Sequence, residues 1–190
     1  MNFFTKKELI FFILIIICSV TIIFFIEKNY EIYFDKSKID FVDFECDSKI
    51  NIYFCPQDFC STRMISEINS AQDTILVAIY SFTHSEIADA LINAKQRGVK
   101  IIIVMDYLQS TSKHSLHLLL EKNDIPVFIK KDLGSMHNKF MVIDGIKVFT
   151  GSFNYSLNAD TKNDENLLLI LDDCIAKKFV LKFNSLSNTN

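Results

Sequence analysis

Two short apolar stretches, residues 74–80 and residues 99–105, constrain the fold of this chain most strongly. Each is rich in β-branched side chains and too short for an ordinary helix, which is typical of a buried β-strand. Residues 85–96 between them are predicted to form a helix, which Gly98 terminates. A strand, a helix and a second buried strand in this order predict an α/β fold.

The same alternation of strands and helices continues on both sides of this unit. Further strands are expected at residues 49–54, 126–129, 137–144, 146–150 and 167–171, and further helices at residues 59–71, 112–122 and 175–183. Since the central strands are apolar on both faces, we expect a mixed, largely parallel β-sheet that is covered by helices on both faces. The sequence therefore predicts one α/β domain at residues 49–184, followed by a polar tail at residues 185–190.

The N-terminal residues 9–26 are apolar throughout and contain no charged side chain. A run of these 18 residues is about the minimum for a helix that crosses a bilayer. A cleaved signal peptide is the alternative, but bulky and charged residues follow the run, so we favour an uncleaved transmembrane anchor. Residues 27–48 would then form a stalk between the membrane and the domain.

Two lysines, Lys6 and Lys7, precede the apolar run and give it a mild positive-inside bias. We therefore expect residues 1–8 in the cytoplasm and the folded domain on the periplasmic or extracellular side of a bacterial inner membrane. Secretion after signal cleavage is one alternative. In a eukaryote, the same segment would serve as an anchor in the mitochondrial outer membrane.

The stretch 137–144 carries the first candidate functional residues. Its residues alternate as in a strand, so His137 and Lys139 share one face while Asp144 lies on the other. The two side chains on the shared face start about 7 Å apart along the strand. An imidazole can attack phosphorus or transfer a proton, and an ammonium neutralises charge on the phosphate oxygens. The two side chains could therefore act together on a phosphate ester. A His-x-Lys pair without further motifs, however, more often lies on the surface of an ordinary β-hairpin.

A second group of polar residues follows this strand. Gly151 and Ser152 allow backbone and hydroxyl groups to approach an anion closely, and Asn154 adds an amide donor. A carboxylate at the start of the next strand, either Asp164 or Glu165, would hold one imidazole nitrogen and raise the basicity of the other. Spacing alone does not choose between these two carboxylates.

The combined pattern resembles the signature of the phospholipase D superfamily. It consists of His-x-Lys, four further residues, Asp, and a Gly-Ser-x-Asn run that begins twelve residues after the lysine. Residues 151–156, together with Glu165 and Asn166, are most similar to the small single-motif branch of bacterial nucleases and mitochondrial cardiolipin-hydrolase or piRNA-type nucleases. The resemblance covers roughly residues 50–183.

Several expectations follow from this resemblance. It implies Glu165, rather than Asp164, as the carboxylate that orients His137, and it implies a structural role for Asp144. The chain holds a single His-x-Lys pair, while phosphodiester transfer by histidine needs two acid–base groups. We therefore expect a homodimer that brings two copies of His137 together across a twofold axis.

The expected mechanism is a ping-pong phosphodiester hydrolysis that rests on His137, Lys139 and Glu165 as catalytic residues. His137 of one protomer would form a phosphohistidine, while the second copy acts first as general acid and then activates water. Lys139, Ser152 and Asn154 would bind the non-bridging phosphate oxygens. No metal or other cofactor takes part in this scheme.

Three functions fit these residues. A membrane-anchored endonuclease acting on DNA or RNA is favoured by the similarity of residues 151–156 to bacterial nucleases. A phospholipase D or cardiolipin hydrolase acting on phospholipid headgroups is favoured by the anchor, and a non-catalytic nucleic-acid-binding module is the weakest alternative. Because the net charge is −3, nucleic acid must be bound locally, and Lys130 and Lys131 are either such a contact or a solvated loop.

The five cysteines and two of the four histidines are the remaining candidates for special chemistry. Outside the membrane, we expect one disulfide among Cys46, Cys55 and Cys60, with a zinc site as the less favoured alternative. His114 and His117 lie three residues apart on an expected helix, a spacing that can bind metal. No carboxylate partner lies at a matching spacing, so we interpret both histidines as solvent-facing.

Overall fold

The computed structural model describes Thr21, residues 49–131 and residues 134–187. The expected anchor at residues 9–26 and the expected stalk at residues 27–48 lie outside these described residues, apart from Thr21. In the part of the chain that is described, no helix is both long enough and apolar enough to cross a membrane.

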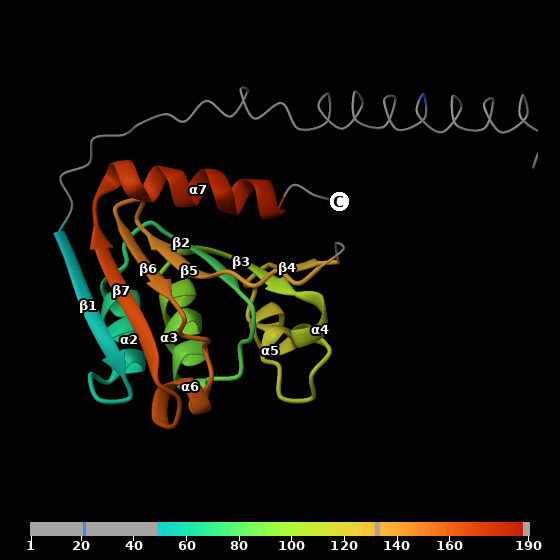
Figure 1. Cartoon of the computed structure of the whole chain (residues 1–190), viewed down its shortest axis with the longest axis horizontal. Helices are drawn as coiled ribbons and strands as arrows, with labels where there is room; N and C mark the ends of the chain where they lie inside the picture. Colours follow the sequence, from blue (N-terminus) through green and yellow to red (C-terminus); the bar gives the residue numbers. More distant parts are fainter. Residues whose placement is uncertain (1–20, 22–48, 132–133, 188–190) are drawn as a thin grey trace, which may run out of the picture. The chain divides into compact units, whose positions relative to one another are not determined.

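The unit of the chain that spans residues 44–190 is built around a seven-stranded sheet (Figure 1). The strands are β1 (Lys49–Cys55), β2 (Thr74–Ile79), β3 (Lys100–Asp106), β4 (Val127–Lys130), β5 (Lys139–Ile143), β6 (Lys147–Gly151) and β7 (Glu165–Leu171). The helices are α2 (Cys60–Ser70), α3 (Ser85–Gln96), α4 (Tyr107–Ser110), α5 (His117–Lys122), α6 (Leu157–Thr161) and α7 (Asp173–Ser187). Across the sheet, the strands follow the order β1-β7-β6-β5-β2-β3-β4.

The sheet is mixed, as predicted, but the prediction that it is largely parallel is wrong. Among the described strands, only β2 with β3 and β3 with β4 pair in parallel, and the other four pairings are antiparallel. The turn at Asp144–Gly145 joins β5 directly to β6, and so short a connection fits only antiparallel neighbours. The connection from β6 to β7 contains only the five-residue helix α6 and returns the chain so that β7 pairs with β6 in the antiparallel direction.

Helices cover both faces of the sheet, which confirms that part of the prediction (Figure 1). On one face, Met64 of α2 and Leu91 of α3 belong to a core that includes strand residues such as Val77. On the other face, α7 contributes Phe183 to a second core that includes Phe140 of β5. Full burial of one such side chain stabilises a fold by about 1.5–3 kcal/mol. Because each core contains many such side chains from the strands, the two cores together hold the strands, and therefore their ends, in place.

Two helices differ from the prediction in their bounds. The helix expected at residues 112–122 is helical only from His117 to Lys122, as α5, and the four-residue helix α4 ahead of it was not predicted. Helix α7 runs on to Ser187, so residues 185–187 of the expected polar tail are helical. Leu186 explains the extension, because it continues the apolar stripe that Phe179 and Phe183 begin and it is buried in the second core.

A disulfide joins Cys55 at the end of β1 to Cys60 at the start of α2. This pair confirms the expected disulfide, whereas Cys46, the third candidate, lies outside the described residues. Cys174, near the start of α7, is a free thiol. The disulfide closes the loop that leads from the edge strand into the first helix on that face.

Candidate active site

The expected site residues come from strand ends that meet at one edge of the sheet. Lys139 begins β5 and pairs with Ile79, the last residue of β2. Gly151 ends β6, and Glu165 begins β7. Because β5, β6 and β7 run alternately in opposite directions, the start of β5, the end of β6 and the start of β7 lie on the same edge.

His137 and Lys139 contact each other directly at this edge. The Lys139 Nζ atom lies 3.3 Å from Nδ1 and 3.4 Å from Nε2 of His137, and it donates a hydrogen bond of 3.1 Å to the His137 carbonyl oxygen. His137 is exposed. An imidazole and an ammonium are thus presented together to solvent, as their position on one strand face predicted.

Tyr80 supports both of these side chains and was missed by the sequence analysis. Its ring centroid lies 4.4 Å from that of His137, and the Lys139 Nζ atom lies 5.1 Å from the centroid of the same ring. The Tyr80 hydroxyl accepts a hydrogen bond of 3.2 Å from Nε2 of Gln109. Tyr80 was included in an expected strand, but no local pattern shows that this strand ends beside the start of β5.

The environment of Lys139 changes its proton affinity. Partial burial, which disfavours the charged form, lowers the pKa of Lys139 below its usual value, and the charge of Glu165 opposes this shift. The ammonium therefore loses its proton at a lower pH than a fully solvated lysine does. Glu165 is the acidic residue whose charge keeps the protonated form more stable than burial alone would.

Ser152 and Glu165 form a hydrogen-bonded unit at the ends of β6 and β7. The Ser152 hydroxyl donates a short hydrogen bond to Oε2 of Glu165 and accepts one of 3.0 Å from the Asn166 backbone N–H. The other carboxylate oxygen of Glu165 accepts a hydrogen bond of 3.0 Å from the Asn163 side chain. The structure thus places Glu165 against Ser152, and its role in orienting His137 stays a prediction.

Gly151 permits the close approach of the two strands at this point. Its φ is +145°, and a Cβ atom built there would lie 2.3 Å from the Asn166 carbonyl oxygen. That separation is far below van der Waals contact, so a side chain at this position would push β6 and β7 apart. The Ser152 backbone N–H, which donates to the same carbonyl oxygen at 3.1 Å, depends on this approach.

Backbone hydrogen bonds fix the loop that carries Asn154. The Tyr155 backbone N–H donates to the Ser81 carbonyl oxygen at 3.1 Å, and the Thr83 and His84 N–H groups donate to the Tyr155 carbonyl oxygen at 2.7 and 2.9 Å. The Asn154 Oδ1 atom accepts a hydrogen bond of 3.3 Å from the Ser81 N–H. Since its amide oxygen is used in this way, the N–H groups of Asn154 are the ones available to an anion.

Asp160 anchors the far end of this loop through contacts that the sequence did not reveal. It accepts hydrogen bonds from the backbone N–H of Ser61 at 3.0 Å and from the Ser61 hydroxyl at 2.7 Å. The buried His84 places its Nε2 atom 3.4 Å from the same carboxylate. Ser61 lies 99 residues away from Asp160, so no local signal could have predicted this anchor.

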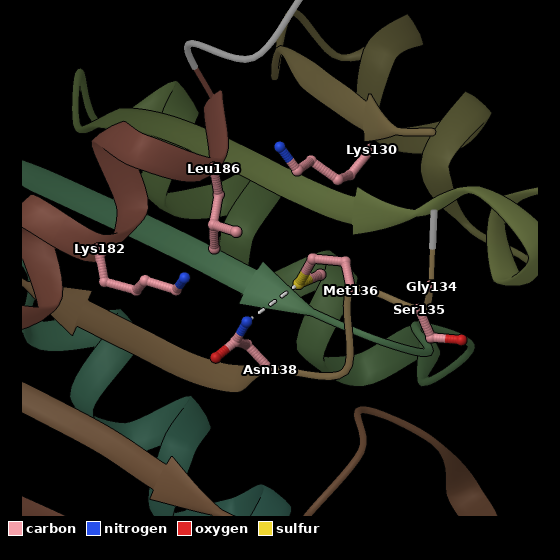
Figure 2. Close-up of a pocket in the computed structure, with 7 residues that line it drawn as sticks. All are labelled: Lys130, Gly134, Ser135, Met136, Asn138, Lys182 and Leu186. Carbon is pink, nitrogen blue, oxygen red and sulfur yellow. Dashed lines mark hydrogen bonds between the residues drawn. The ribbon is translucent and has the colours of Figure 1, made fainter. Parts of the chain in front are cut away.

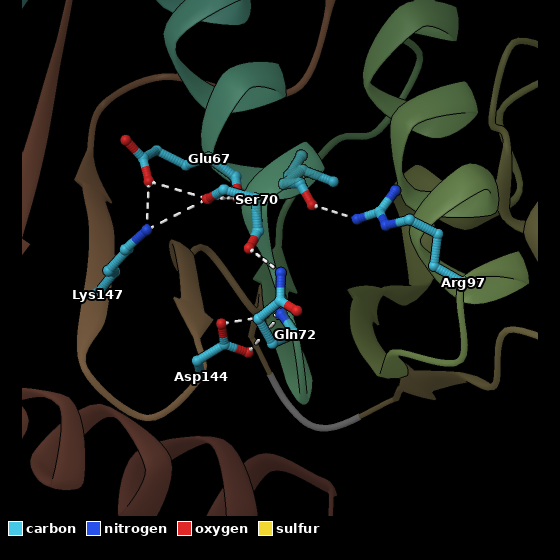
Figure 3. A network of polar contacts seen from close by, with 7 residues as sticks. Glu67, Ser70, Gln72, Arg97, Asp144 and Lys147 are labelled. Atoms are coloured by element: carbon cyan, nitrogen blue, oxygen red, sulfur yellow. Dashed lines mark hydrogen bonds and ion pairs between the residues drawn. The ribbon is translucent and has the colours of Figure 1, made fainter.

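Asp144 lies at the opposite end of β5 from Lys139, and its contacts confirm the expected structural role (Figure 3). Its carboxylate accepts backbone hydrogen bonds from Gln72 at 3.0 Å, Asp73 at 2.9 Å and Thr74 at 3.0 Å. Desolvation by itself would raise the pKa of Asp144. The backbone hydrogen bonds and the charge of Lys147 lower the pKa by more than this, so the pKa of Asp144 is lower than its usual value. Asp144 therefore holds the start of β2 to the turn after β5.

The other histidines take no part in this constellation. His114 is exposed, as predicted, while His117 is half-buried and contacts the Ser115 hydroxyl at 3.0 Å through Nδ1. Among the described residues, the polar and ring contacts of His137 are with Lys139 and Tyr80, and no second imidazole is among them. A single described chain therefore supplies one imidazole to the site.

Comparison with known proteins identifies relatives that share most of this domain. The family model described as "Cardiolipin synthase, PLD-like domain" matches residues 64–187. The chain is 36% identical over 143 residues to a phospholipase D of Rickettsia prowazekii. The aligned region covers 75% of this chain and 70% of that protein. It is 29% identical over 135 residues to a mitochondrial cardiolipin hydrolase of Xenopus laevis, which covers 70% of this chain and 64% of that protein.

Solved structures with the same fold include two bacterial proteins. Nuc from Salmonella typhimurium, described as a phospholipase D family member, has a TM-score of 0.71 and 30% identity and covers 75% of this chain and 95% of its own. NucT from Helicobacter pylori has a TM-score of 0.67 and 31% identity and covers 74% of this chain and 96% of its own. The chain therefore belongs to the phospholipase D superfamily of phosphodiester hydrolases.

Proposed function

We propose that this chain is a metal-independent endonuclease that cleaves DNA or RNA through a phosphohistidine on His137. The observation that carries the proposal is the contact of the His137 imidazole with the Lys139 ammonium above the Tyr80 ring. This contact presents a nucleophile and a cation to the same exposed point. Asn154 lies in the adjoining loop, where its side-chain N–H groups add donors for phosphate oxygens, and Ser152 lies at the adjoining strand end, where its hydroxyl would turn from Glu165 to the phosphate.

The proposed reaction has two chemical steps. In the first, a ring nitrogen of His137 attacks phosphorus, the bond to the leaving oxygen breaks, and His137 of the partner subunit gives that oxygen a proton. In the second, the same partner imidazole takes a proton from water, the water oxygen attacks phosphorus, and the phosphorus–nitrogen bond breaks. Lys139 neutralises charge on the non-bridging oxygens in both steps. A homodimer supplies the second imidazole that one chain lacks.

The roles of two further groups belong to this proposal. Glu165 acts as the carboxylate that orients His137 and holds Lys139 protonated, the latter supported by its effect on the pKa of Lys139. Residues 9–26 anchor the protein in a membrane, with the domain on the periplasmic or extracellular side of a bacterial inner membrane. The Cys55–Cys60 disulfide supports an oxidising compartment for the domain. Secretion and a mitochondrial outer membrane remain the alternatives for location.

A lipid phosphodiesterase is the second candidate function. It is favoured by the names of the relatives, a phospholipase D and a mitochondrial cardiolipin hydrolase. The chemistry at phosphorus would be the same, because both substrates are phosphodiesters. The two candidates differ in what holds the substrate outside the reacting group.

The test compares the full chain with His137→Asn and with His114→Asn, a matched change at an exposed histidine outside the site. Labelled single-stranded DNA and RNA are each incubated in excess chelator and followed by gel, in parallel with vesicles that contain cardiolipin. We expect cleavage of DNA or RNA by wild type and His114→Asn, and none by His137→Asn. In mixtures with His137→Asn after subunit exchange, activity should follow the square of the wild-type fraction.

Three outcomes would contradict the proposal. Cleavage of cardiolipin without cleavage of DNA or RNA would support the lipid candidate instead. Activity that disappears in chelator and returns with a divalent cation would overturn the metal-independent mechanism. Activity that falls in proportion to the wild-type fraction would show that each chain acts alone, which removes the dimeric site from the mechanism.

A further inference from the structure

Three shallow concavities adjoin one another along one side of the domain, beginning at Lys139. The first has a volume of about 370 Å³ and is lined by Lys139, by Gly151 and by Lys178 and Lys182 of α7. The second, of about 210 Å³, shares Asn138 and Lys182 with the first. Lys139 and Gly151 thus line a concavity that leads from the strand ends to the side of α7.

The third concavity extends the same series towards the end of β4. It has a volume of about 300 Å³ and shares Lys130, Gly134 and Ser135 with the second, and it adds Lys131. Figure 2 shows Lys182 and Lys130 extending from α7 and from the end of β4 towards the second concavity. We call Lys178, Lys182, Lys130 and Lys131 the lysine path.

The described residues that line these concavities are rich in lysine. The described residues that line the three concavities include five lysines, counting Lys139, and a single acidic residue, Asp106. Asp106 is buried, and its carboxylate accepts hydrogen bonds from the backbone N–H groups of Gln109 at 3.1 Å and Met136 at 3.0 Å. Its charge is therefore used inside the protein. A chain with a net charge of −3 thus brings five lysines of its described part together beside its candidate site.

We propose that the lysine path binds the phosphodiester backbone of a nucleic acid strand on one side of the cleaved phosphate. This inference rests on the proposed nuclease function and names where its substrate is held. A nucleic acid repeats its negative charge along its length, which matches cations spread over three successive concavities. A lipid headgroup presents one or two phosphates at a single point, and cations beyond the first concavity would not reach it.

The test uses the full chain with Lys178→Gln and Lys182→Gln combined, and Lys177→Gln as the matched control. Lys177 lies on the same helix and is exposed, but it pairs with Asp173 and lines none of the three concavities. Binding of a 20-nucleotide single-stranded DNA is measured by fluorescence anisotropy in the His137→Asn background. Hydrolysis of bis(p-nitrophenyl) phosphate, a small phosphodiester, is measured in the active background.

Two lost phosphate contacts should weaken binding about tenfold at 0.15 M salt and lower the slope of log K against log salt by about 1.4, because each contact with a single strand contributes about 0.7. The Lys177→Gln control should stay within about twofold of wild type. In the variant Lys130→Gln with Lys131→Gln, hydrolysis of the small ester should change by less than about twofold, because these two lysines lie outside the concavity that Lys139 lines and the ester does not extend beyond one phosphate. Binding of the 20-nucleotide DNA by this variant should nevertheless weaken about as much as it does in the first double variant.

Each contrary result has a distinct meaning. If wild type hydrolyses neither the small ester nor DNA, the proposed function fails and the path fails with it. If wild type cleaves DNA but neither double variant weakens binding, or Lys177→Gln weakens it equally, the lysine path is wrong while the nuclease function stands. If the double variants instead lose binding only to vesicles that contain cardiolipin, the path is a lipid-binding surface and the proposal is overturned.

Discussion

Replacing Asp144 by alanine is expected to reduce stability and to leave the chemistry intact. The carboxylate accepts three backbone hydrogen bonds, from Gln72, Asp73 and Thr74, and ties the start of β2 to the turn that joins β5 to β6. It lies at the other end of β5 from Lys139. Loss of this tie should loosen the pairing of β2 with β5 from the end that is remote from the site.

The size of the effect follows from these contacts. A hydrogen bond to a charged acceptor contributes about 1.5–3 kcal/mol to stability when it is buried away from water. Because Gln72 and Asp73 are exposed, we expect each of the three hydrogen bonds to Asp144 to contribute about 1 kcal/mol. Asp144 also has a φ of +51°, where alanine is strained by roughly a further 1 kcal/mol. A loss of about 3–4 kcal/mol in the free energy of unfolding corresponds to a Tm lower by roughly 10–15 °C in a domain of this size.

Thermal unfolding followed by circular dichroism would measure this loss, with Asp89→Ala on the exposed face of α3 as the control. Asp144→Asn, which tolerates the positive φ and keeps one acceptor oxygen, should lose about half as much. The lowered pKa of Asp144 means that its stabilising effect is complete above the unfolded value of 3.8 and is lost as the pH falls through the folded value. An unchanged Tm, or a folded variant whose kcat falls a hundredfold at low temperature, would refute this reasoning.

Two further predictions concern the other strand ends. Gly151→Ala should destabilise the domain by at least about 2 kcal/mol more than Gly98→Ala. Both glycines have a positive φ, but only at Gly151 would a Cβ atom lie against the Asn166 carbonyl oxygen. Equal shifts in Tm for the two variants would contradict this steric argument. Glu165→Gln should move the alkaline limb of kcat/KM to lower pH, because burial lowers the pKa of Lys139 and the charge of Glu165 opposes that shift. A pH–rate profile with the small ester, compared with Glu121→Gln at an exposed position, checks this, and a limb that stays in place would count against it.

The elements with strong local patterns could be predicted from the sequence. The apolar, β-branched run that forms β2 and the helix that ends before Gly98 need only their own residues to specify them. The spacing of His137, Lys139 and Gly151 likewise indicated a site, because alternation along a strand and a tight turn are local properties. What these patterns specify is the conformation of a segment and the side to which its residues point.

Relations between distant segments could not be predicted in the same way. Strand direction depends on how the chain returns to the sheet, and an alternation of strands and helices does not show that β5, β6 and β7 form an antiparallel series. Tyr80 joins the site only because β2 and β5 are neighbours, and Lys182 joins it only because α7 packs on that face of the sheet. Asp160 meets Ser61 for the same kind of reason, through packing of parts that share no local pattern.

The pairing of β1 with β7 has a consequence for the synthesis of the protein. Lys49 pairs with Leu171, so the first strand of the domain has its only described strand neighbour near the end of the chain. A growing chain leaves the ribosome from its N-terminus, and β1 must wait unpaired until almost the whole domain has been made. During that interval its apolar residues Ile50, Ile52 and Phe54 form an open strand edge to which other chains can attach. Conditions that slow translation should therefore increase aggregation of this protein through its earliest strand.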